Sequence, residues 1–409
     1  MTSSDGKSAK AATEPAALVG LELELDIGPV AHGGHCVARH AGRVVFVRHS
    51  IPGERVLARV TEGTEESRFL RADAVKVLAP SCDRVQPPCP YSGPGRCGGC
   101  DFQHVSLRRQ RILLAEVIRE QLQRLAGIDW PVEVEAVPGD VEGLRWRTRV
   151  RFVAAPDGRP GLRKHRSHDV IPVADCRIAS TELPDVAPAL RAGADTAEAV
   201  LSATGEQVIV TDPKTAPVVT ERALARSWQV HAGDFWQVHP GAADALVAAV
   251  IEGVQPSPGE RCWDLYTGVG VFAAALAQSV GREGAVIAVD SHRRAAESAR
   301  LNLADVGSVR VVADRVDRFV RSRIAQGRLD VVVLDPPRAG AGAGVVRGIA
   351  KRSPRAIAYV ACDPAALARD LATLATLGYE LVSLRAFCLF PMTAHVECVA
   401  ICHQQSPNR

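Results

Sequence analysis

The spacing of hydrophobic and polar positions changes along the chain and divides it into regions. In the first region, residues 21–27 alternate between apolar and charged side chains, residues 44–47 form a β-branched run, and Pro52-Gly53 marks a turn. Alternation with a period of two is typical of a strand that buries one face. We therefore predict a small all-β unit over residues 18–79, folded as a β-barrel.

The middle region combines a helix with strands. Apolar residues recur at helical spacing between residues 104 and 126, which predicts one amphipathic helix. Further on, Arg145, Arg147, Arg149 and Arg151 alternate with uncharged residues. On a strand, this spacing would place all four guanidinium groups on one face, where they could contact nucleic-acid phosphates. The alternative interpretation is an ordinary amphipathic strand with a solvated basic face.

The last region alternates β-branched runs with helical stretches. Five runs are strand candidates, at residues 286–289, 309–312, 331–334, 357–360 and 396–401. This alternation is typical of a parallel sheet that helices cover on both faces. We predict an α/β domain over residues 235–409.

Length and charge limit the organisation of the chain. Because 409 residues exceed what one core usually supports, we expect a multidomain protein. Its parts are a disordered tail (1–17), the β-barrel (18–79), an α+β central domain (80–234) and the α/β domain (235–409). The net charge of +3 is nearly balanced, so a nucleic-acid-binding protein of this composition must concentrate its basic residues locally.

The chain shows no targeting or membrane signal. The tail has no apolar core, and no stretch reaches the roughly 18 uninterrupted apolar residues that a membrane helix needs. Without a secretion signal, the eleven cysteines are expected in a reducing compartment, where clustered cysteines indicate a metal site. We expect a cytoplasmic protein with no membrane partner.

A glycine-bearing loop lies where the first strand of the α/β domain should turn into a helix. Gly268 and Gly270 in this loop would let the backbone approach a ligand closely, and Asp290 ends the next strand. This arrangement predicts a cofactor that carries a nucleoside. The loop also fits G-x-G-x-x-A, so a nicotinamide dehydrogenase stays open as an alternative, as does tight strand–helix packing without a ligand.

Two later strands end in groups that suit covalent chemistry. One runs into Asp335-Pro336-Pro337-Arg338, and the next into Ala361-Cys362-Asp363-Pro364. Ligands of open α/β sheets bind beyond the carboxyl ends of the strands, so the acid and the thiol should face the crevice of the glycine loop. A dehydrogenase has no obvious use for the thiol, whereas a methyltransferase that acts on an unreactive pyrimidine carbon does.

Four further cysteines form a candidate metal site. Cys89, Cys97 and Cys100 have the spacing C-x7-C-G-G-C, and Cys176 follows much later. Four thiolates suit either a cubane iron–sulfur cluster or a tetrahedral zinc ion. Cys82 is an alternative to Cys89.

Taken in order, these motifs resemble the RNA uracil-5-methyltransferase family, and the resemblance covers almost the whole chain after the tail. That family joins a TRAM domain, an OB-like β-barrel, to an iron–sulfur segment and a Rossmann-like methyltransferase domain. The strings that carry the resemblance are residues 31–34 and 52–56, Phe235-Trp236-Gln237-Val238, residues 264–270, 335–338 and 361–364.

The resemblance implies a reaction and a set of site residues. S-adenosylmethionine would donate the methyl group, RNA (ribosomal or transfer) would receive it, and no obligate protein partner is implied. Cys362 would be the nucleophile and Glu397 the base. The cofactor would be contacted by Gln237, Tyr266, Asp290 and Asp335, with Asp314 a further candidate on the adenine side. The wide separation of Cys176 and the resemblance both favour a four-iron, four-sulfur (4Fe–4S) cluster on Cys89, Cys97, Cys100 and Cys176.

The chain also departs from the family pattern. Thr267 stands where a cysteine is common, Val271 where an asparagine often contacts the cofactor, and Ala-Cys-Asp-Pro replaces Ser-Cys-Asn-Pro around Cys362. Two other functions stay open at this point: a non-catalytic RNA-binding iron–sulfur protein and an RNA cytosine-5 methyltransferase.

Overall fold

The computed structural model describes residues 17–405 and contains two compact units. The first contains the described residues as far as Ala31 together with His35–Arg84, and the second contains His32–Gly34 and the chain from Val85 onward. The tail expected over residues 1–17 lies outside the described residues, apart from Ala17. None of the helices within residues 17–405 combines the length and the apolar character that crossing a membrane requires.

The first unit is a five-stranded sheet with the spatial order β1-β4-β5-β3-β2. Its strands are β1 (Glu22–Asp26), β2 (Cys36–His40), β3 (Arg43–Arg48), β4 (Arg55–Glu62) and β5 (Phe69–Ala79). The segment after β1 returns to β2, where Gly28 N donates to Val37 O and Val37 N donates to Pro29 O, each at 2.8 Å. These bonds bring the two edges of the sheet together, as in a barrel. The strands predicted at residues 21–27 and 44–47 are confirmed as β1 and β3.

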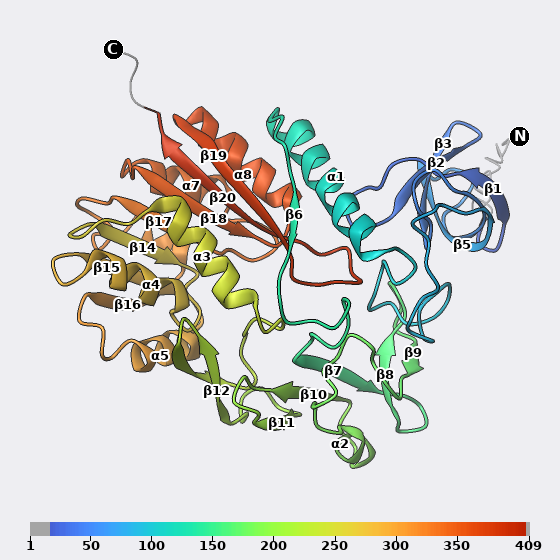
Figure 1. Cartoon of the computed structure of the whole chain (residues 1–409), viewed down its shortest axis with the longest axis horizontal. Coiled ribbons are helices and arrows are strands. Elements are labelled where there is room, and N and C mark those ends of the chain that lie inside the picture. The colour runs from blue at the N-terminus through green and yellow to red at the C-terminus, as the bar shows by residue number, and fades with distance from the viewer. Residues whose placement is uncertain (1–16, 406–409) are drawn as a thin grey trace, which may run out of the picture. The chain divides into compact units, whose positions relative to one another are not determined.

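The second unit is built around an eight-stranded sheet (Figure 1). In spatial order its strands are β16 (Val309–Ala313), β15 (Ala285–Asp290), β14 (Arg261–Leu265), β17 (Val331–Leu334), β18 (Ala356–Ala361), β20 (Glu397–Gln404), β19 (Tyr379–Cys388) and β6 (Val134–Ala136). All five strands predicted for this region are confirmed, as β15, β16, β17, β18 and β20.

The expectation of a wholly parallel sheet is wrong at one position. Strand β20 runs antiparallel to both of its neighbours, β18 and β19. The reason is the short connection between β19 and β20, which leaves no room for the crossover helix that parallel neighbours need. Strands β19 and β6 were not predicted.

Helices cover both faces of this sheet, as predicted (Figure 1). The chain moves outward from β14 to β16 and then returns through β17 and β18, so right-handed crossovers place the two sets of helices on opposite faces. The first set comprises α3 (Ala242–Val254), α4 (Val271–Val280) and α5 (Arg293–Asn302). The second set comprises α6 (Val316–Phe319), α7 (Gly342–Ala350) and α8 (Pro364–Thr376). The chain changes direction between β14 and β17, which is where α/β sheets open a ligand crevice.

The central segment is continuous with this sheet. The predicted helix is α1 (Leu107–Ala126), which begins at the N-cap Ser106, ends at Gly127 and packs against α8. The boundary expected at residues 234/235 lies inside the second compact unit. The remaining central elements are α2 (Ala187–Arg191) and the strands β7 (Arg149–Ala154), β8 (Pro160–Arg163), β9 (Val170–Pro172), β10 (Thr196–Leu201), β11 (Gln207–Val210), β12 (Val218–Ala223) and β13 (Arg226–His231). Five of these strands form a sheet in the order β11-β10-β7-β8-β9, and β12 pairs with β13.

Candidate active site

A cavity of about 870 Å³ opens in the second unit beyond the carboxyl ends of β14, β15, β17 and β18. Six of the seven residues predicted to contact cofactor or substrate line it: Gln237, Tyr266, Asp290, Asp335, Cys362 and Glu397. The fold therefore brings together side chains that are far apart in the sequence, such as Gln237 and Glu397, which are separated by 160 positions.

The loop between β14 and α4 forms one wall of the cavity. Tyr266 adopts a left-handed backbone with φ 66°, which is rare for a bulky residue and marks a strained position. Gly268 N donates to Asp290 Oδ2 at 2.9 Å, and His292 N donates to Asp290 Oδ1 at 2.8 Å. A Cβ atom at Gly268 would meet nothing within 4 Å, so there is open space beside this backbone. Gly270 has φ 99°, and a Cβ there would lie 2.7 Å from Leu303.

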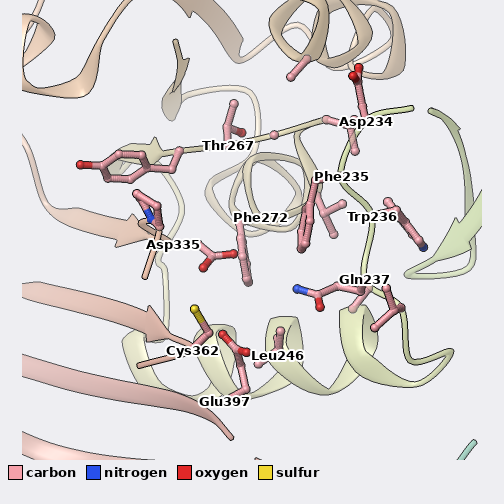
Figure 2. Close-up of a pocket in the computed structure, with 18 of the residues that line it drawn as sticks. Asp234, Phe235, Trp236, Gln237, Leu246, Thr267, Phe272, Asp335, Cys362 and Glu397 are labelled. Carbon is pink, nitrogen blue, oxygen red and sulfur yellow. The ribbon is translucent and has the colours of Figure 1, made fainter. Parts of the chain in front are cut away.

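The Cys362 thiol and the Glu397 carboxylate, which also line the cavity, come from the neighbouring strands β18 and β20. Cys362 follows β18 directly, and Glu397 is the first residue of β20. Because β20 runs antiparallel to β18, with Ala361 opposite Cys398, the start of one strand lies beside the end of the other. Figure 2 shows the Cys362 sulfur and the Glu397 carboxylate next to each other. Cys362 also immediately precedes Asp363, the N-cap of α8, and the positive end of a helix favours a thiolate.

Asp264 and Glu397 are buried and Asp335 is half-buried, and all three carboxyl groups resist ionisation. Burial raises the pKa of Asp264 to about 7 and raises the pKa of Asp335 as well, with the Asp264 charge adding to the effect on Asp335. Burial also raises the pKa of Glu397 well above its ordinary value, and the Asp335 charge raises it further. Desolvation penalises each charged form, and neighbouring acids penalise one another. These carboxyl groups therefore hold protons at a pH where an exposed carboxyl would have lost its own.

The thiol responds to the same surroundings. Burial raises the pKa of Cys362 to about 11, and the negative charge of Glu397 acts in the same direction. The Arg338 guanidinium opposes both effects. Arg338 is thus a side-chain cation that favours the thiolate in this cavity.

A segment before α3 forms the opposite wall. Phe235 and Gln237 both face the cavity across from Cys362 and Glu397 (Figure 2). Phe235 is 74% exposed although it is a large apolar residue, so an aromatic face is open to a ligand. Asp234 anchors this segment through an ion pair with Arg294 on α5.

Several lining residues were not predicted to have a role. Arg338 lies 3.4 Å from His395 Nε2, measured from its Nη2 atom, and both residues line the cavity. Phe390 lines it too, as does Arg147, whose predicted role was contact with nucleic-acid phosphates from a strand face. Arg338 belongs to the Asp335–Arg338 motif, whereas His395 and Phe390 precede Glu397 without a sequence signal that assigned either of them a role.

One predicted residue lies elsewhere. Asp314 is absent from the residues that line the cavity. Its carboxylate accepts from Arg315 N at 2.8 Å and from Arg318 Nη1 at 3.3 Å. These contacts tie Asp314 to the start of α6.

Comparisons with known proteins agree with this geometry. The chain matches the TRAM domain over residues 16–75 and the family described as tRNA (Uracil-5-)-methyltransferase over residues 219–405. A Streptomyces coelicolor protein named as an uncharacterized RNA methyltransferase is 49% identical over an alignment that covers 96% of this chain and 95% of that protein. The chain belongs to the RNA (uracil-5-)-methyltransferase family.

Two more distant proteins are similar over nearly their whole length. The 23S rRNA (uracil(1939)-C(5))-methyltransferase RlmD of Shewanella baltica is 28% identical, with 93% of this chain and 95% of that protein covered. The Pyrococcus abyssi tRNA (uracil-54, C5)-methyltransferase, solved in complex with S-adenosyl-L-homocysteine, is 24% identical. It has the same fold, with a TM-score of 0.69 over 93% of this chain and 99% of that chain. This methyltransferase is thus an S-adenosylmethionine-dependent enzyme of RNA, and the nicotinamide dehydrogenase and non-catalytic alternatives are set aside.

The methyltransferase accommodates one of its departures from the family pattern. Thr267 Oγ1 donates to Asp264 Oδ2, and Ala273 N donates to the same oxygen at 2.9 Å. The hydroxyl thereby partners a buried carboxyl on β14, where the β14–α4 loop begins. Val271 lines the cavity at the start of α4 and offers no polar group, so a contact made by asparagine elsewhere has no counterpart here.

The four predicted cysteine ligands gather in one part of the second unit. The charges of Cys89, Cys97 and Cys176 each act to raise the pKa of Cys100, so the four sulfurs lie within electrostatic range of one another. The backbones of Cys97 and Lys164 form an isolated antiparallel β-bridge. A Cβ at Gly98 would lie 2.3 Å from His165 N, so only a glycine lets the cysteine-bearing segment approach the β8–β9 hairpin this closely. Among the residues that the structure describes, no group of three or more histidine, cysteine, aspartate or glutamate side chains is arranged to hold a metal ion.

The expectation of four arginines on one strand face is wrong. Strand β7 begins only at Arg149, and Arg145 has a left-handed backbone with φ 60°. Arg149 is buried and pairs with the buried Glu221 at 2.9 Å, whereas Arg151 is exposed and pairs with Glu198. Arg145 instead binds Asp175 at 2.7 Å. The alternation in sequence therefore does not produce a continuous basic track, because the strand is interrupted at its start.

Proposed function

We propose that this methyltransferase transfers the methyl group of S-adenosylmethionine to carbon 5 of a uridine in structured RNA, through a covalent bond between Cys362 and carbon 6 of the uracil ring. The observation that carries the proposal is the juxtaposition of Cys362 and Glu397 at one end of a cavity that Gln237, Tyr266, Asp290 and Asp335 also line.

The cofactor half of the proposal is supported by the β14–α4 loop. Asp290 accepts two backbone N–H groups and keeps acceptor capacity, because a carboxylate has about four lone-pair sites. This suits the ribose hydroxyls of the cofactor, and the open space beside Gly268 suits close approach of a ligand. When bound, S-adenosylmethionine supplies an electrophilic methyl group. We assign Gln237, Tyr266 and Asp335 to the same binding site because they line the same cavity.

The nucleophile is Cys362. Carbon 5 of uracil is too weakly nucleophilic to accept a methyl group directly, but a thiolate that adds to carbon 6 gives it enolate character. The pKa of Cys362, about 11, means that the thiol has to be deprotonated for attack, and the Arg338 charge favours that step. After carbon 5 has taken the methyl group, its proton must leave before the thiolate can be eliminated.

The base is Glu397. Its raised pKa makes it a stronger base than an exposed carboxylate once it is ionised, and it lies beside the thiol that must leave. In this scheme Glu397 takes the proton from carbon 5, the C5–H electron pair restores the ring double bond, and the C6–S bond breaks to regenerate the Cys362 thiolate.

RNA is the substrate class, and the exposed ring of Phe235 supports a flipped-out base. A base inside a helix or a stacked loop cannot reach a thiol in a cavity, so it must be extruded. Aromatic side chains commonly stack on such bases, and Phe235 lines the cavity opposite the catalytic pair. The relatives named above act on 23S rRNA and on tRNA, so both are the substrates to test.

Trapping with 5-fluorouridine RNA tests the mechanism. Because fluorine cannot leave as a cation, the adduct should persist when cofactor is present, and peptide mass spectrometry should locate the RNA on Cys362. Cys362→Ala should lose methyl transfer by at least about 10³-fold while its affinity for the cofactor stays within about threefold. Cys402→Ala, a buried cysteine on β20 outside the cavity, is the matched control and should keep activity. An active enzyme whose adduct forms at another residue would refute the proposal.

We also propose that a 4Fe–4S cluster assembles on Cys89, Cys97, Cys100 and Cys176, with a structural role. Hydrogen bonds to the sulfurs support it: Gln103 Nε2 lies 3.4 Å from Cys100 Sγ, and Gly99 N lies 3.5 Å from Cys97 Sγ. Such bonds are usual around cluster thiolates. In addition, Cys100 and Cys176 pack against the buried Trp146 and Met392, so a cluster here would brace the segment that leads to His395. Anaerobically purified protein should contain iron and sulfide in equal amounts, and stoichiometric zinc alone would rule the cluster out.

A further inference from the structure

A buried carboxylate that the proposed reaction does not use lies outside the residues that line the cavity. Asp370 on α8 is 5% exposed. Its Oδ2 atom accepts hydrogen bonds from the Tyr359 hydroxyl at 2.7 Å, from Ala341 N at 2.9 Å and from Gly342 N at 3.0 Å. Three donors on one buried oxygen form a strong and geometrically restrictive contact.

The two backbone donors belong to the start of α7. The first N–H groups of a helix have no partner inside the helix, and a side chain at the N-cap usually supplies one. Here the N-cap is Ala341, which has no side chain able to do so. Asp370 supplies that acceptor from a different helix. Ala341 N also lies 3.0 Å from the Tyr359 hydroxyl oxygen, so both members of the pair contact the same amide.

The capped segment is the continuation of the Asp335–Arg338 motif. Asp335 follows β17 directly, and residues 336–341 lead from it to α7. The turn closes where Gly340 N donates to Pro337 O at 2.8 Å. Gly340 has φ 86°, and a Cβ there would lie 2.9 Å from Asp370 Oδ2. The loop therefore rests directly on the carboxylate. Pro336 and Pro337 have φ fixed by their rings, whereas residues 339–341, two alanines and one glycine, would have more freedom without such an anchor.

The segments that meet at this anchor lead to residues that line the cavity. Tyr359 lies on β18, three positions before Cys362, and the anchored loop carries Arg338 and follows Asp335. Tyr266 lies close enough for the Asp370 charge to act on it: burial raises the pKa of Tyr266 to about 12, and Asp370 contributes. Asp370 thus lies at the junction of the strand that ends in the nucleophile and the loop that carries its counter-charge.

We propose that Asp370 is a positioning residue for methyl transfer: by capping α7 from α8, together with Tyr359, it fixes the 336–341 loop and so holds Arg338 and Asp335 toward Cys362. The catalytic consequence rests on the proposed function, whereas the capping itself does not. Residues that orient a reacting group typically change rates by about 10- to 100-fold when they are removed.

Two variants and a matched control test this role. Asp370→Ala removes the acceptor, and Tyr359→Phe removes only one hydroxyl while keeping the ring, so it serves if the first variant fails to fold. Glu260→Gln is the control, because Glu260 pairs with Arg355 immediately before β18, outside the cavity. Asp370→Asn keeps one acceptor oxygen and should recover part of the activity that Asp370→Ala loses.

The expected result separates positioning from general stability. In Asp370→Ala, kcat should fall by about 10- to 100-fold while the KM for S-adenosylmethionine stays within about threefold, and alkylation of Cys362 should slow because Arg338 is no longer held. Hydrogen exchange at the Ala341 and Gly342 amides should accelerate in this variant by more than its loss of global stability explains, whereas in Glu260→Gln it should accelerate only as far as that loss does. Tyr359→Phe should shift the same readouts in the same direction by a smaller factor.

Each opposite result has a distinct meaning. Unchanged exchange at the two amides would refute the capping. Faster exchange with unchanged kcat would refute the positioning role, as would a loss of kcat that Glu260→Gln reproduces at equal loss of stability. If wild-type protein did not methylate RNA, the proposed function would fail, and the exchange measurement would still decide whether Asp370 caps α7.

Discussion

Acidic residues at the two ends of the parallel strands in the eight-stranded sheet have pKa values shifted in opposite directions. The end where these strands begin is called the amino edge, and the end where they finish is called the carboxyl edge. At the amino edge, Glu260 accepts from Arg355 Nε at 2.6 Å and from Nη2 at 2.8 Å, and this pair lowers the pKa of Glu260. At the carboxyl edge, burial raises the pKa of Asp264, Asp335 and Glu397. The two edges belong to the same strands, so the difference comes from the groups around each acid and not from the sheet.

This difference separates stability from chemistry. A paired acid stabilises the folded chain but is a weak base, because its partner favours the charged form and lowers the pKa. Acids for which burial outweighs the nearby cation cost stability, and they keep a basicity that a reaction can use. We therefore expect substitutions at the carboxyl edge to change activity and substitutions at the amino edge to change stability.

The largest effect is expected for Glu397→Gln. Without the base, turnover should fall by about 10²- to 10⁴-fold, while attack by Cys362 and the first methyl transfer remain possible. The covalent protein–RNA complex should therefore accumulate, which a denaturing gel with labelled RNA would reveal. The exposed Glu380→Gln on β19 is the control. Loss of turnover without accumulation would assign Glu397 to an earlier step.

A smaller effect is expected for Arg338→Gln, and it depends on pH. The Arg338 charge lowers the pKa of Cys362, which burial and Glu397 raise to about 11. Removing that charge raises the pKa further, so the thiolate fraction at any pH below the pKa falls, by about tenfold if the pKa of the thiol rises by one. The rate of Cys362 alkylation, followed by peptide mass spectrometry from pH 7 to 10, should rise with pH in both proteins and be lower in the variant. Arg347→Gln on α7 should match wild type, and identical profiles for Arg338→Gln would contradict the assignment.

Glu260→Gln should reverse the pattern, with a loss of stability and no loss of turnover. The free energy of unfolding at neutral pH should fall by about 2 kcal/mol, the usual worth of hydrogen bonds to a charged group. Because the folded pKa of Glu260 is below its ordinary value of 4.5, the stabilisation is complete above that value and is lost as the pH falls through the folded pKa. Denaturant unfolding of both proteins should differ at pH 7 and converge in acid. An equal difference at both pH values would show that the ion pair is not responsible.

The smallest effect is expected for Asp314→Ala. Asp314 lies at the end of β16 but outside the cavity, so the dissociation constant for S-adenosylmethionine should change by less than about twofold. Asp290→Ala should weaken binding by at least about tenfold, since it removes hydrogen bonds to a charged acceptor. Calorimetric titration of both variants with S-adenosylmethionine would measure this difference in affinity. Comparable losses of affinity in the two variants would show that Asp314 does contact the cofactor.

Local patterns were sufficient for much of the fold. The runs of β-branched residues predicted β15, β16, β17, β18 and β20, because buried strands are recognisable from a few consecutive residues. Because the glycine loop, the Asp335–Arg338 motif and the Ala361–Pro364 motif each follow a strand, the sequence also indicated that these three strand ends face one crevice. The reversed direction of β20 and the contribution of β6 to the edge of the sheet depend on pairing between distant segments, which local spacing does not encode.

The residues of the candidate site also differ in how far the sequence could place them. Cys362 and Asp335 could be predicted because each follows a recognisable strand, and strand ends gather at one edge. The four arginines from Arg145 to Arg151 could not, since their spacing says nothing of where the strand begins or which of them meets Glu221. For Asp314, the spacing placed it correctly at a strand end, but only the packing of α6 shows that it lies away from the cavity.

The sequence by itself determined the glycine loop, the alternation of strands and helices and the side chains proposed to react, because these are properties of consecutive residues. Only the tertiary structure decided how those groups differ in chemistry. Arg338 acts on the thiol, Asp370 caps a helix to which it does not belong, and Glu260 is neutralised while Glu397 is not. Electrostatic and hydrogen-bonding effects depend on distance and burial in three dimensions, and neither can be read from positions along a chain.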